Sequence, residues 1–486
     1  MIEEEIFTPL VDIGANLLPA WKTSLAQTIK IDNGGKHYTV KLRGQARWSD
    51  GVAITAKDVV FSINAYRNPE VIEGQSARLK LLRSMRVLNH HTVEIILSQP
   101  SPPFLTNALG AILVLPQHIL ERFPNDAGKE AQFINTNSDF AEHPVISGPF
   151  RVRRFVPDAY TILEPNPLYW GSKPHLSQIA FRVYPQQDSL YAAVDAGEID
   201  VTDIPPNLWR VHERLKGRHR FVNWPWNVAF TLLPNFADPA VAFLKDVSVR
   251  RAILYGIDRR SIVSGIMNGQ ADVLGGPIPA FSPYYNPKIR QYPYDPEKAR
   301  RMLEADGWKL RGATRYKGGT PLRFTLKNGG STDAVASNIV ELIQANLKSI
   351  GIDCQLQNEE INTFFADLHA TKFQVALRGR ILPPYPDDYE NFDSHQTRNK
   401  GGYNLGSYSN SRIDALIERA RTAPSASVGR QALYAYQEAA AQDLPALFLY
   451  SNKLGAVVPD NLEGYVLTPT AAAALPMGLE TWRKTK

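Results

Sequence analysis

Acidic and aromatic side chains are concentrated in one short stretch, RILPPYPDDYENF, which spans residues 380–392. Asp387 and Asp388 form an adjacent carboxylate pair within it, and a glycosidase needs only two carboxylates at a suitable separation. In a proline-rich loop, however, adjacent acids usually cap turns and contact solvent. The apolar run 373–377 directly precedes this stretch, so we expect a strand that leads into a stiff loop.

Other catalytic signatures are missing from the sequence, which contains no HExxH, GxSxG, GxxxxGK[ST] or GxGxxG motif. The adjacent His90 and His91 would point to opposite faces of an extended segment and make a poor metal pair. The single cysteine, Cys354, can form neither an internal disulfide nor a Cys/His metal site. We therefore predict no catalytic residues, no metal site and no cofactor, and a protein that is not an enzyme.

Length and composition indicate a large globular protein. A chain of 486 residues is too long for one ordinary core, so at least two lobes are expected. Hydrophobic residues make up 44% of the chain and charged residues 21%. The net charge of +6, from 54 basic and 48 acidic residues, is a small excess, and we expect no nucleic-acid partner. No stretch of 18 apolar residues is present that would predict a transmembrane helix.

Short strands alternate with helices that have clear start and stop signals. Residues 36–43 alternate at period two, and Thr55 with Asp58 forms the capping box of a following helix. Asp295 and Pro296 open another helix, which Gly307 ends. Further elements are expected as helices at 333–349, 410–421 and 426–442 and as strands around Cys354 and at 446–450. The pattern predicts a mixed α/β fold.

Seven segments, in order along the chain, resemble the family 5 extracellular solute-binding proteins, the receptors of ABC importers for oligopeptides, dipeptides, nickel chelates and some oligosaccharides. They are HYTVKLRGQARWSDGVAITAKDVVFSI (37–63), ISGPFRV (146–152), NPLYWGSKPHLSQIAFRVYP (166–185), AAVDAGEIDV (192–201), DVSVRRAILYGIDRRSIVSGIMNGQA (246–271), YPYDPEKARRMLEADGW (292–308) and YSNSRIDALIERA (408–420). The motifs are mostly scaffold, so the resemblance implies the fold more firmly than the ligand.

The implied fold is a two-lobed α/β architecture of the periplasmic-binding-protein type (type II, cluster C), with mixed sheets and a hinge. Lobe one comprises residues 1–228 plus 452–486, including a family-specific subdomain at about 13–140. Lobe two comprises residues 229–451. The resemblance places the chain crossings near 224–229 and 450–456, and ligand is enclosed when the lobes close.

The implied function is that of a substrate-binding receptor, which captures a peptide or related small solute and delivers it to a membrane permease. We expect a monomer in the periplasm or tethered outside the membrane. The N-terminus MIEEEIFTPLV lacks a signal-peptide pattern. The resemblance implies that this chain starts after the signal and the first strand, so lobe one is expected to lack its N-terminal strand.

In peptide-binding members an aspartate holds the ligand's amine, and the resemblance aligns that aspartate with Pro384. Arg378 matches an arginine that meets the ligand's carboxylate in some members, although it could equally pair with Asp387 or Asp388. Two hypotheses follow. Either Asp387 or Asp388 binds the ligand's amine in place of the missing aspartate, or the ligand has no free α-amine, as in a saccharide, an opine-like compound or a capped peptide. Further candidates for ligand contact are Tyr385, Trp224, Trp226 and Asn227.

Two other classes of protein stay open at this stage. A ligand-sensing regulator could share the fold, but it normally needs a fused DNA-binding helix-turn-helix, which this sequence does not show. An oligosaccharide receptor would rely more on aromatic side chains than on Arg378, because sugars stack on ring faces.

Overall fold

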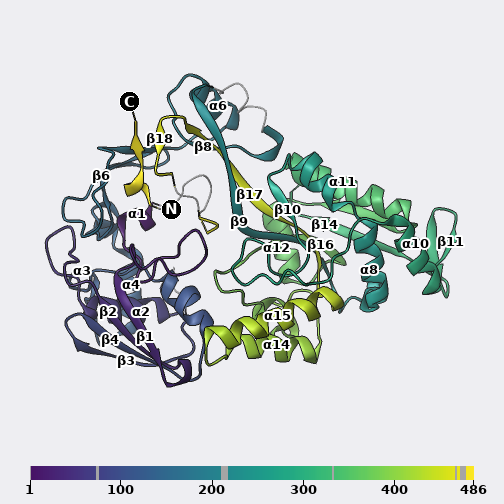
Figure 1. Ribbon diagram of the computed structural model, residues 1–486, viewed down its shortest axis with the longest axis horizontal. Coiled ribbons are helices and arrows are strands. Elements are labelled where there is room, and N and C mark those ends of the chain that lie inside the picture. The colour runs from purple at the N-terminus through teal and green to yellow at the C-terminus, as the bar shows by residue number, and fades with distance from the viewer. Residues whose placement is uncertain are drawn as a thin grey trace.

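Two bodies joined by two long strands make up the molecule in the computed structural model, which describes residues 2–72, 76–208, 217–330, 333–465, 468–470 and 478–485. The joining strands are β9 (His219–Pro234) and β17 (Leu447–Pro459), which pair in antiparallel fashion along most of their length. They run diagonally between the bodies (Figure 1). Both bodies therefore depend on a single pair of strands for their relative placement.

A mixed seven-stranded sheet contains both joining strands. Its order is β10 (Ala271–Val273), β17, β9, β16 (Val375–Ile381), β14 (Arg323–Asn328) and β15 (Asp353–Asn358), with β8 (Thr202–Asp203) paired to β17. Strand β14 is parallel to both β15 and β16, whereas β16 is antiparallel to β9. The helix α11 (Ala334–Ser349) connects β14 to β15 and packs on both, so β14, α11 and β15 form a βαβ unit.

The first body, which contains the N-terminal part of the chain, has two antiparallel sheets. One has the order β1 (Ala26–Asp32), β2 (His37–Leu42), β4 (Thr92–Leu97), β3 (Leu82–Asn89), and the other β5 (Phe150–Val156), β6 (Tyr160–Pro165), β7 (Ile179–Arg182). Small pairings involve β11 (Lys309–Arg311), β12 (Thr314–Lys317), β13 (Thr320–Pro321), β18 (Leu462–Glu463) and β19 (Arg483–Lys484).

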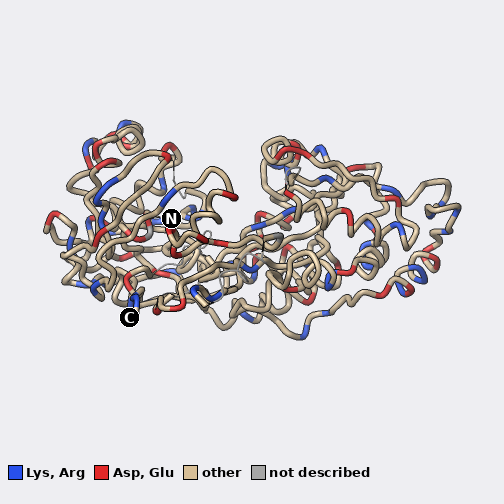
Figure 2. The backbone as a smooth tube through the Cα atoms, turned by 90° about the horizontal axis from the view of Figure 1, so that it is seen from above, with Lys and Arg blue, Asp and Glu red and all other residues tan. Residues whose placement is uncertain are grey.

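The remaining helices are α1 (Glu3–Ile6), α2 (Ala56–Arg67), α3 (Gln117–Leu120), α4 (Ala127–Thr136), α5 (Ser138–Glu142), α6 (Gln187–Asp195), α8 (Val247–Gly256), α9 (Arg259–Ser261), α10 (Pro296–Ala305), α12 (Ile361–His369), α13 (Tyr389–Phe392), α14 (Ser411–Arg421) and α15 (Ala426–Asp443). Helices α14 and α15 lie against each other below the joining strands (Figure 1). In Figure 2, which colours the charged residues, basic and acidic positions are interspersed over both bodies.

Two large hydrophobic cores lie at either end of the joining strands. The first core contains buried residues from Ile6 to Trp224 together with a late group from Ala456 to Trp482. The second core contains buried residues from Ala229 to Tyr450. Each joining strand contributes to both cores. The chain therefore passes twice between the cores, once in β9 and once in β17.

The pairing of β9 with β17 is irregular where the strands leave one core for the other. Register shifts occur between Phe448 and Tyr450 and between Ser451 and Lys453. An extra residue in one strand bends it locally and increases its twist. The strand predicted at 446–450 is longer than expected, because the ladder continues through the half-buried residues 452–454 into the buried residues 455–459.

Local start and stop signals are confirmed. Thr55 and Asp58 form both halves of the capping box of α2, and Asp295 caps α10. Gly307 and Gly351 have φ angles of 88° and 85°, the left-handed conformation that ends a helix with least strain in glycine. The predicted mixed α/β fold with two lobes is observed.

Replacing Thr55 with alanine should lower the free energy of unfolding by about 1 kcal/mol, because the N-terminal amides of α2 lose a side-chain acceptor. Urea unfolding followed by circular dichroism measures this change. Thr55→Ser retains the hydroxyl and should behave like the parent protein. Equal stability of Thr55→Ala and the parent would show that the cap contributes nothing.

Candidate functional site

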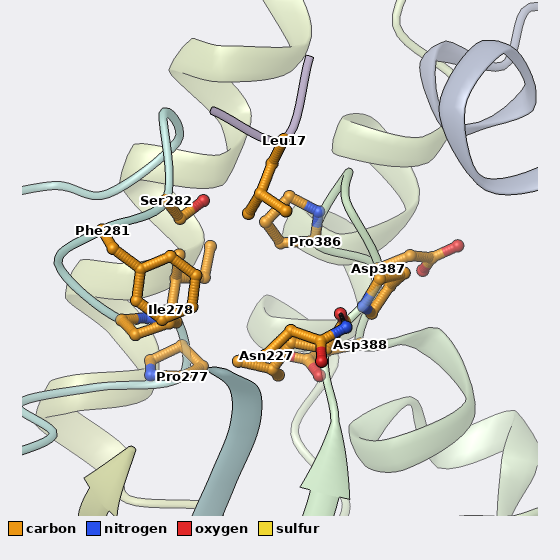
Figure 3. A pocket seen from close by; sticks show the side chains of 12 residues that line it. Leu17, Asn227, Pro277, Ile278, Phe281, Ser282, Pro386, Asp387 and Asp388 are labelled. Atoms are coloured by element: carbon orange, nitrogen blue, oxygen red, sulfur yellow. Dashed lines mark hydrogen bonds between the residues drawn. The ribbon is translucent and has the colours of Figure 1, made fainter. Parts of the chain in front are cut away.

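A pocket lies where the loop after β16 meets the first body. Loop residues Leu382, Pro386 and Asp387 line one side, and Leu17 from the N-terminal part of the chain reaches over them (Figure 3). The other lining residues are Asn227, Pro277, Ile278, Pro279, Phe281, Ser282, Pro383 and Asp388. In this arrangement the space is small: about 10 Å³ is open to the centre of a water-sized sphere, which is roughly enough for one water molecule.

The β9–β16 ladder positions the start of this loop. The backbone amide of Leu382 donates to the carbonyl oxygen of Asn227 at 2.7 Å. The Asn227 side-chain amide donates in turn to the carbonyl oxygen of Leu382 at 2.9 Å. Asn227 is buried and lines the pocket, as expected for a residue at the first chain crossing. These two bonds extend the strand pairing into the pocket wall.

Asp388 belongs to a buried charged network. Its carboxylate accepts hydrogen bonds from the Arg380 guanidinium and, at 2.7 Å, from the Tyr436 hydroxyl. Arg380 also donates to the carbonyl oxygen of Pro277 at 2.6 Å. The side chains of Arg380 and Asp388 are each only 4% exposed. Burial and the adjacent Asp388 charge raise the pKa of Tyr436 well above its usual value. The pair therefore fixes the loop from inside the molecule.

Asp387 is also paired, although it lies nearer the surface. Its carboxylate accepts from Arg421 Nε at 3.0 Å and from the backbone amide of Tyr389 at 3.1 Å. Burial raises the pKa of Asp387, and the nearby Arg421 charge offsets part of this effect. Neither acid of the predicted pair is thus an isolated anion.

Arg378 lies two residues before Arg380 in β16, so both side chains project from the same face of the strand. Burial, with a further contribution from the Arg380 charge, lowers the pKa of Arg378 to about 10, which leaves it charged at neutral pH. Within the described part of the chain, Arg378 makes no hydrogen bond or ion pair. The described contacts pair Asp387 with Arg421 and Asp388 with Arg380, and the Asp388 charge acts on Arg378 without a direct ion pair.

Tyr385 differs from the expectation that the loop presents it to a ligand. The residue is 1% exposed, its ring packs edge-on against Tyr284, and its hydroxyl donates to the carbonyl oxygen of Ala420 at 2.9 Å. Tyr385 therefore anchors the loop to the α14–α15 side of the core.

The backbone of Tyr385 makes a contact between the two bodies. The side chain of Asn107 accepts from its amide at 2.9 Å and donates to its carbonyl oxygen at 2.8 Å. Asn107 follows Phe104 in a segment that packs in the first core, whereas Tyr385 belongs to the second. Asn107 thus links the loop to the opposite body.

The two tryptophans lie in different surroundings. Trp224 is buried in the first core and meets Tyr465 edge-on at 6.2 Å between ring centroids. Trp226 is half-buried and precedes Asn227 in β9. Neither tryptophan is among the residues that line the pocket.

Sequence reasoning missed four residues that shape this site: Arg380, Arg421, Asn107 and Leu17. Arg380 alone left a signal, because the spacing Arg378-Gly379-Arg380 in a predicted strand places two guanidinium groups on one face. The other three come from distant segments that only the folded chain brings to the loop.

Two α/β bodies joined by paired strands, with a pocket at their junction, define a two-lobed solute-binding protein. The model for the bacterial extracellular solute-binding proteins, family 5 Middle, matches residues 20–403. The chain belongs to this family. The described residues contain no helix long and apolar enough to cross a membrane.

Curated relatives include the oligopeptide-binding protein AppA of Bacillus subtilis, which is 28% identical over 462 residues, covering 92% of this chain and 81% of the relative. The nickel-binding periplasmic protein of Escherichia coli is 25% identical over 390 residues, covering 78% of this chain and 71% of the relative.

Solved structures of relatives show the same fold. The Bacillus subtilis AppA complex with a nonapeptide has a TM-score of 0.77 at 27% identity, covering 100% of this chain and 94% of the other. NikZ from Campylobacter jejuni in complex with Ni(L-His) has a TM-score of 0.79 at 25% identity, covering 99% and 94%.

Asp388→Asn should lower the free energy of unfolding by about 3–5 kcal/mol, because it leaves the Arg380 charge buried without a counter-ion. Chemical denaturation measures this loss. Asp272→Asn is the matched control, since its ion pair with Lys453 is exposed and should contribute at most about 1 kcal/mol. A loss for Asp388→Asn no larger than that of the control would contradict the structural role of this pair.

Asn107→Ala should shift the unliganded protein toward more open arrangements, because both hydrogen bonds to the Tyr385 backbone are lost. Small-angle X-ray scattering should then give a larger radius of gyration than for the parent. Asn64→Ala, at an exposed position of α2, is the control. Identical scattering curves for Asn107→Ala and the parent would rule out this residue as a link between the bodies.

Proposed function

We propose that this protein is the substrate-binding receptor of an ABC importer. It captures a peptide or related small solute between lobe one, residues 1–228 with 452–486, and lobe two, residues 229–451, and delivers it to a membrane permease. Its relatives include an oligopeptide-binding and a nickel-binding protein, which supports this class of function. The pocket between Leu17 and the loop after β16 supports the position of the cleft.

The receptor acts outside the membrane, in the periplasm or tethered to the outer face, as a monomer that docks transiently on its permease. The description of the family as extracellular supports this location.

The ligand class follows from the balance of charge at the loop. Asp387 and Asp388 are neutralised by Arg421 and Arg380, so neither is free to hold the amine of a ligand. Pro384, at the position of the family's amine-binding aspartate, offers no charge either. Arg378 is the remaining group, a half-buried guanidinium that makes no hydrogen bond or ion pair with the described residues. A guanidinium without an ion pair favours a ligand with a carboxylate and without a free α-amine.

Arg378 does not line the pocket itself, and we propose that opening of the two bodies exposes it to the ligand. It lies four residues before the wall residue Leu382, on the strand that leads into the pocket. A guanidinium can hold a carboxylate through two parallel hydrogen bonds, which a neutral side chain cannot reproduce. Apolar lining residues, including Ile278 and Phe281, suit the hydrocarbon part of such a ligand. An opine-like compound or an N-capped peptide has this combination of groups.

The test compares matched ligands by isothermal titration calorimetry. In a series of short peptides, N-acetylation should leave the affinity within about threefold, whereas amidation of the C-terminal carboxylate should weaken binding at least tenfold, because a charge-assisted hydrogen bond contributes about 1.5–3 kcal/mol. Arg378→Gln should reduce binding of the carboxylate ligand by a similar factor. The exposed Arg412→Gln in α14 is the control and should bind like the parent.

Tight binding of a free-amine peptide that N-acetylation abolishes would overturn the ligand class but not the receptor function. Saturable binding of an oligosaccharide that Arg378→Gln leaves unchanged would instead favour a saccharide receptor. Absence of saturable binding to all of these compounds would contradict the receptor function itself.

A further inference from the structure

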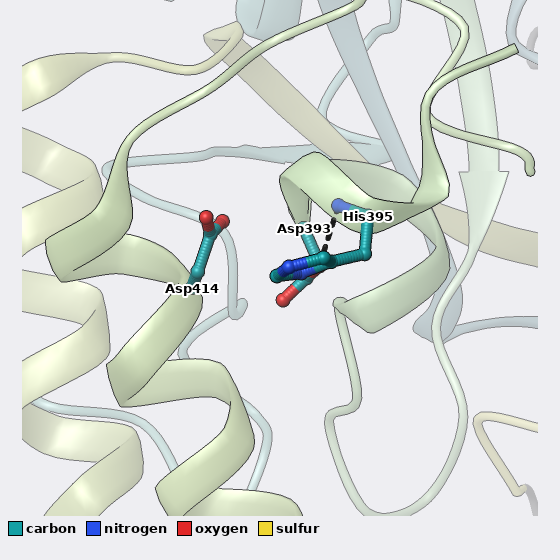
Figure 4. Close-up of side chains that lie close together, drawn as sticks. All are labelled: Asp393, His395 and Asp414. Atoms are coloured by element: carbon teal, nitrogen blue, oxygen red, sulfur yellow. Dashed lines mark hydrogen bonds and ion pairs between the residues drawn. The ribbon is translucent and has the colours of Figure 1, made fainter. Parts of the chain in front are cut away.

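A histidine and two carboxylates come together outside the pocket, at the turn that follows α13. Asp393 follows this helix and caps the 3₁₀ turn Ser394–Gln396, which contains His395. Asp414 lies in the first turn of α14. Figure 4 shows the His395 ring extending from its turn toward Asp414 and lying against the Asp393 carboxylate. One donor atom from each residue lies within 4.8 Å of those of the other two.

Asp393 is a completely buried carboxylate whose charge is only partly matched. Its side chain is 0% exposed, and Oδ1 accepts from the His395 backbone amide and lies 2.8 Å from the ring Nδ1. Oδ2 is buried and has no hydrogen-bond partner among the described residues. Leaving a buried carboxylate oxygen without a donor is costly. A cation beside Oδ2 would remove this cost.

Asp414 is held in place by the same turn. Its two carboxylate oxygens accept from the Ser394 amide at 3.0 Å and from the Ser394 hydroxyl at 2.7 Å. Each oxygen retains a lone pair. Lys400 is nearby, but its ammonium donates to the carbonyl oxygen of Ser394. Across the described ranges, no lysine or arginine forms an ion pair with Asp393 or Asp414.

The donor set indicates the kind of ion. Imidazole nitrogen with two carboxylate oxygens suits zinc and neighbouring divalent metals. With metal–ligand distances near 2.1 Å, donor atoms lie at most about 4.2 Å apart, so the present arrangement must contract slightly. The His395 side chain is 70% exposed and can rotate to do so. His395 Nδ1 lies 2.8 Å from Asp393 Oδ1, a spacing that suits two donors on one ion, so Nδ1 is the metal donor and its bond to the ion replaces the contact with Asp393.

We propose that Asp393, His395 and Asp414 bind one divalent cation of the zinc class, at a site separate from the solute pocket. The three residues do not line that pocket. The ion joins the turn after α13 to the first turn of α14, and solvent completes its coordination on the exposed side of His395. It therefore braces the segment that follows the pocket loop.

The experiment uses the full chain after removal of metal with EDTA and dialysis. Zinc is titrated by calorimetry, and Co²⁺ is used as a visible-absorption probe of imidazole and carboxylate ligation. The parent should bind one ion per chain and gain thermal stability on binding. His395→Ala, at an exposed position, should bind at least tenfold more weakly, because it removes one of three ligands. Asp414→Asn should also weaken binding.

Two controls locate the ion. His143→Ala removes an exposed histidine elsewhere and should bind zinc like the parent. Arg378→Gln alters the proposed solute site and should also leave zinc affinity unchanged. Absence of saturable one-to-one binding, or equal affinity of His395→Ala and the parent, would overturn the proposal. Loss of zinc binding in Arg378→Gln would place the ion in the cleft and overturn it as well.

Discussion

The pairing of β9 with β17 is the interaction on which the rest of the structure depends. These strands are separated by more than two hundred residues in sequence, yet they form one antiparallel ladder, from the pair Leu232 and Leu447 to the pair His219 and Pro459. Each strand is buried in one core at one end and in the other core at the other end. Backbone hydrogen bonds of a ladder resist stretching, whereas bulges allow bending and twisting. Register shifts between Phe448 and Lys453 place that bending between the cores.

The pocket loop is defined by charges that are satisfied before any ligand arrives. Asp388 forms an ion pair with Arg380 and accepts a hydrogen bond from Tyr436, and Asp387 forms an ion pair with Arg421. A buried ion pair of this kind contributes little net stability compared with apolar packing, but losing one partner is costly. Its effect is to hold the loop in one conformation and to leave Arg378 as the unmatched charge.

Local features were the part of the fold that sequence reasoning predicted well. The cap at Thr55, the stop at Gly307 and the βαβ unit around Gly351 all follow from interactions within a few residues. The candidate site was predicted less completely. Asn227 lies in the pocket wall and Asp387 and Asp388 line it, but Tyr385 and Trp224 are packing residues. A buried tyrosine and a ligand-facing tyrosine look alike in a proline-rich loop, because the direction of the ring depends on its distant neighbours.

The sequence by itself determined the class of the fold, the family and the ends of the helices that it predicted, because caps, left-handed glycines and alternating apolar residues act over a few positions. Only the tertiary structure decided the partners of the charged side chains. The contacts of Asp387 with Arg421, Asp388 with Tyr436 and Asn107 with Tyr385 join segments 34 to 278 residues apart. Such distances are set by how helices and sheets pack, and no local pattern encodes them. The same packing brings Asp414 to Asp393 and His395.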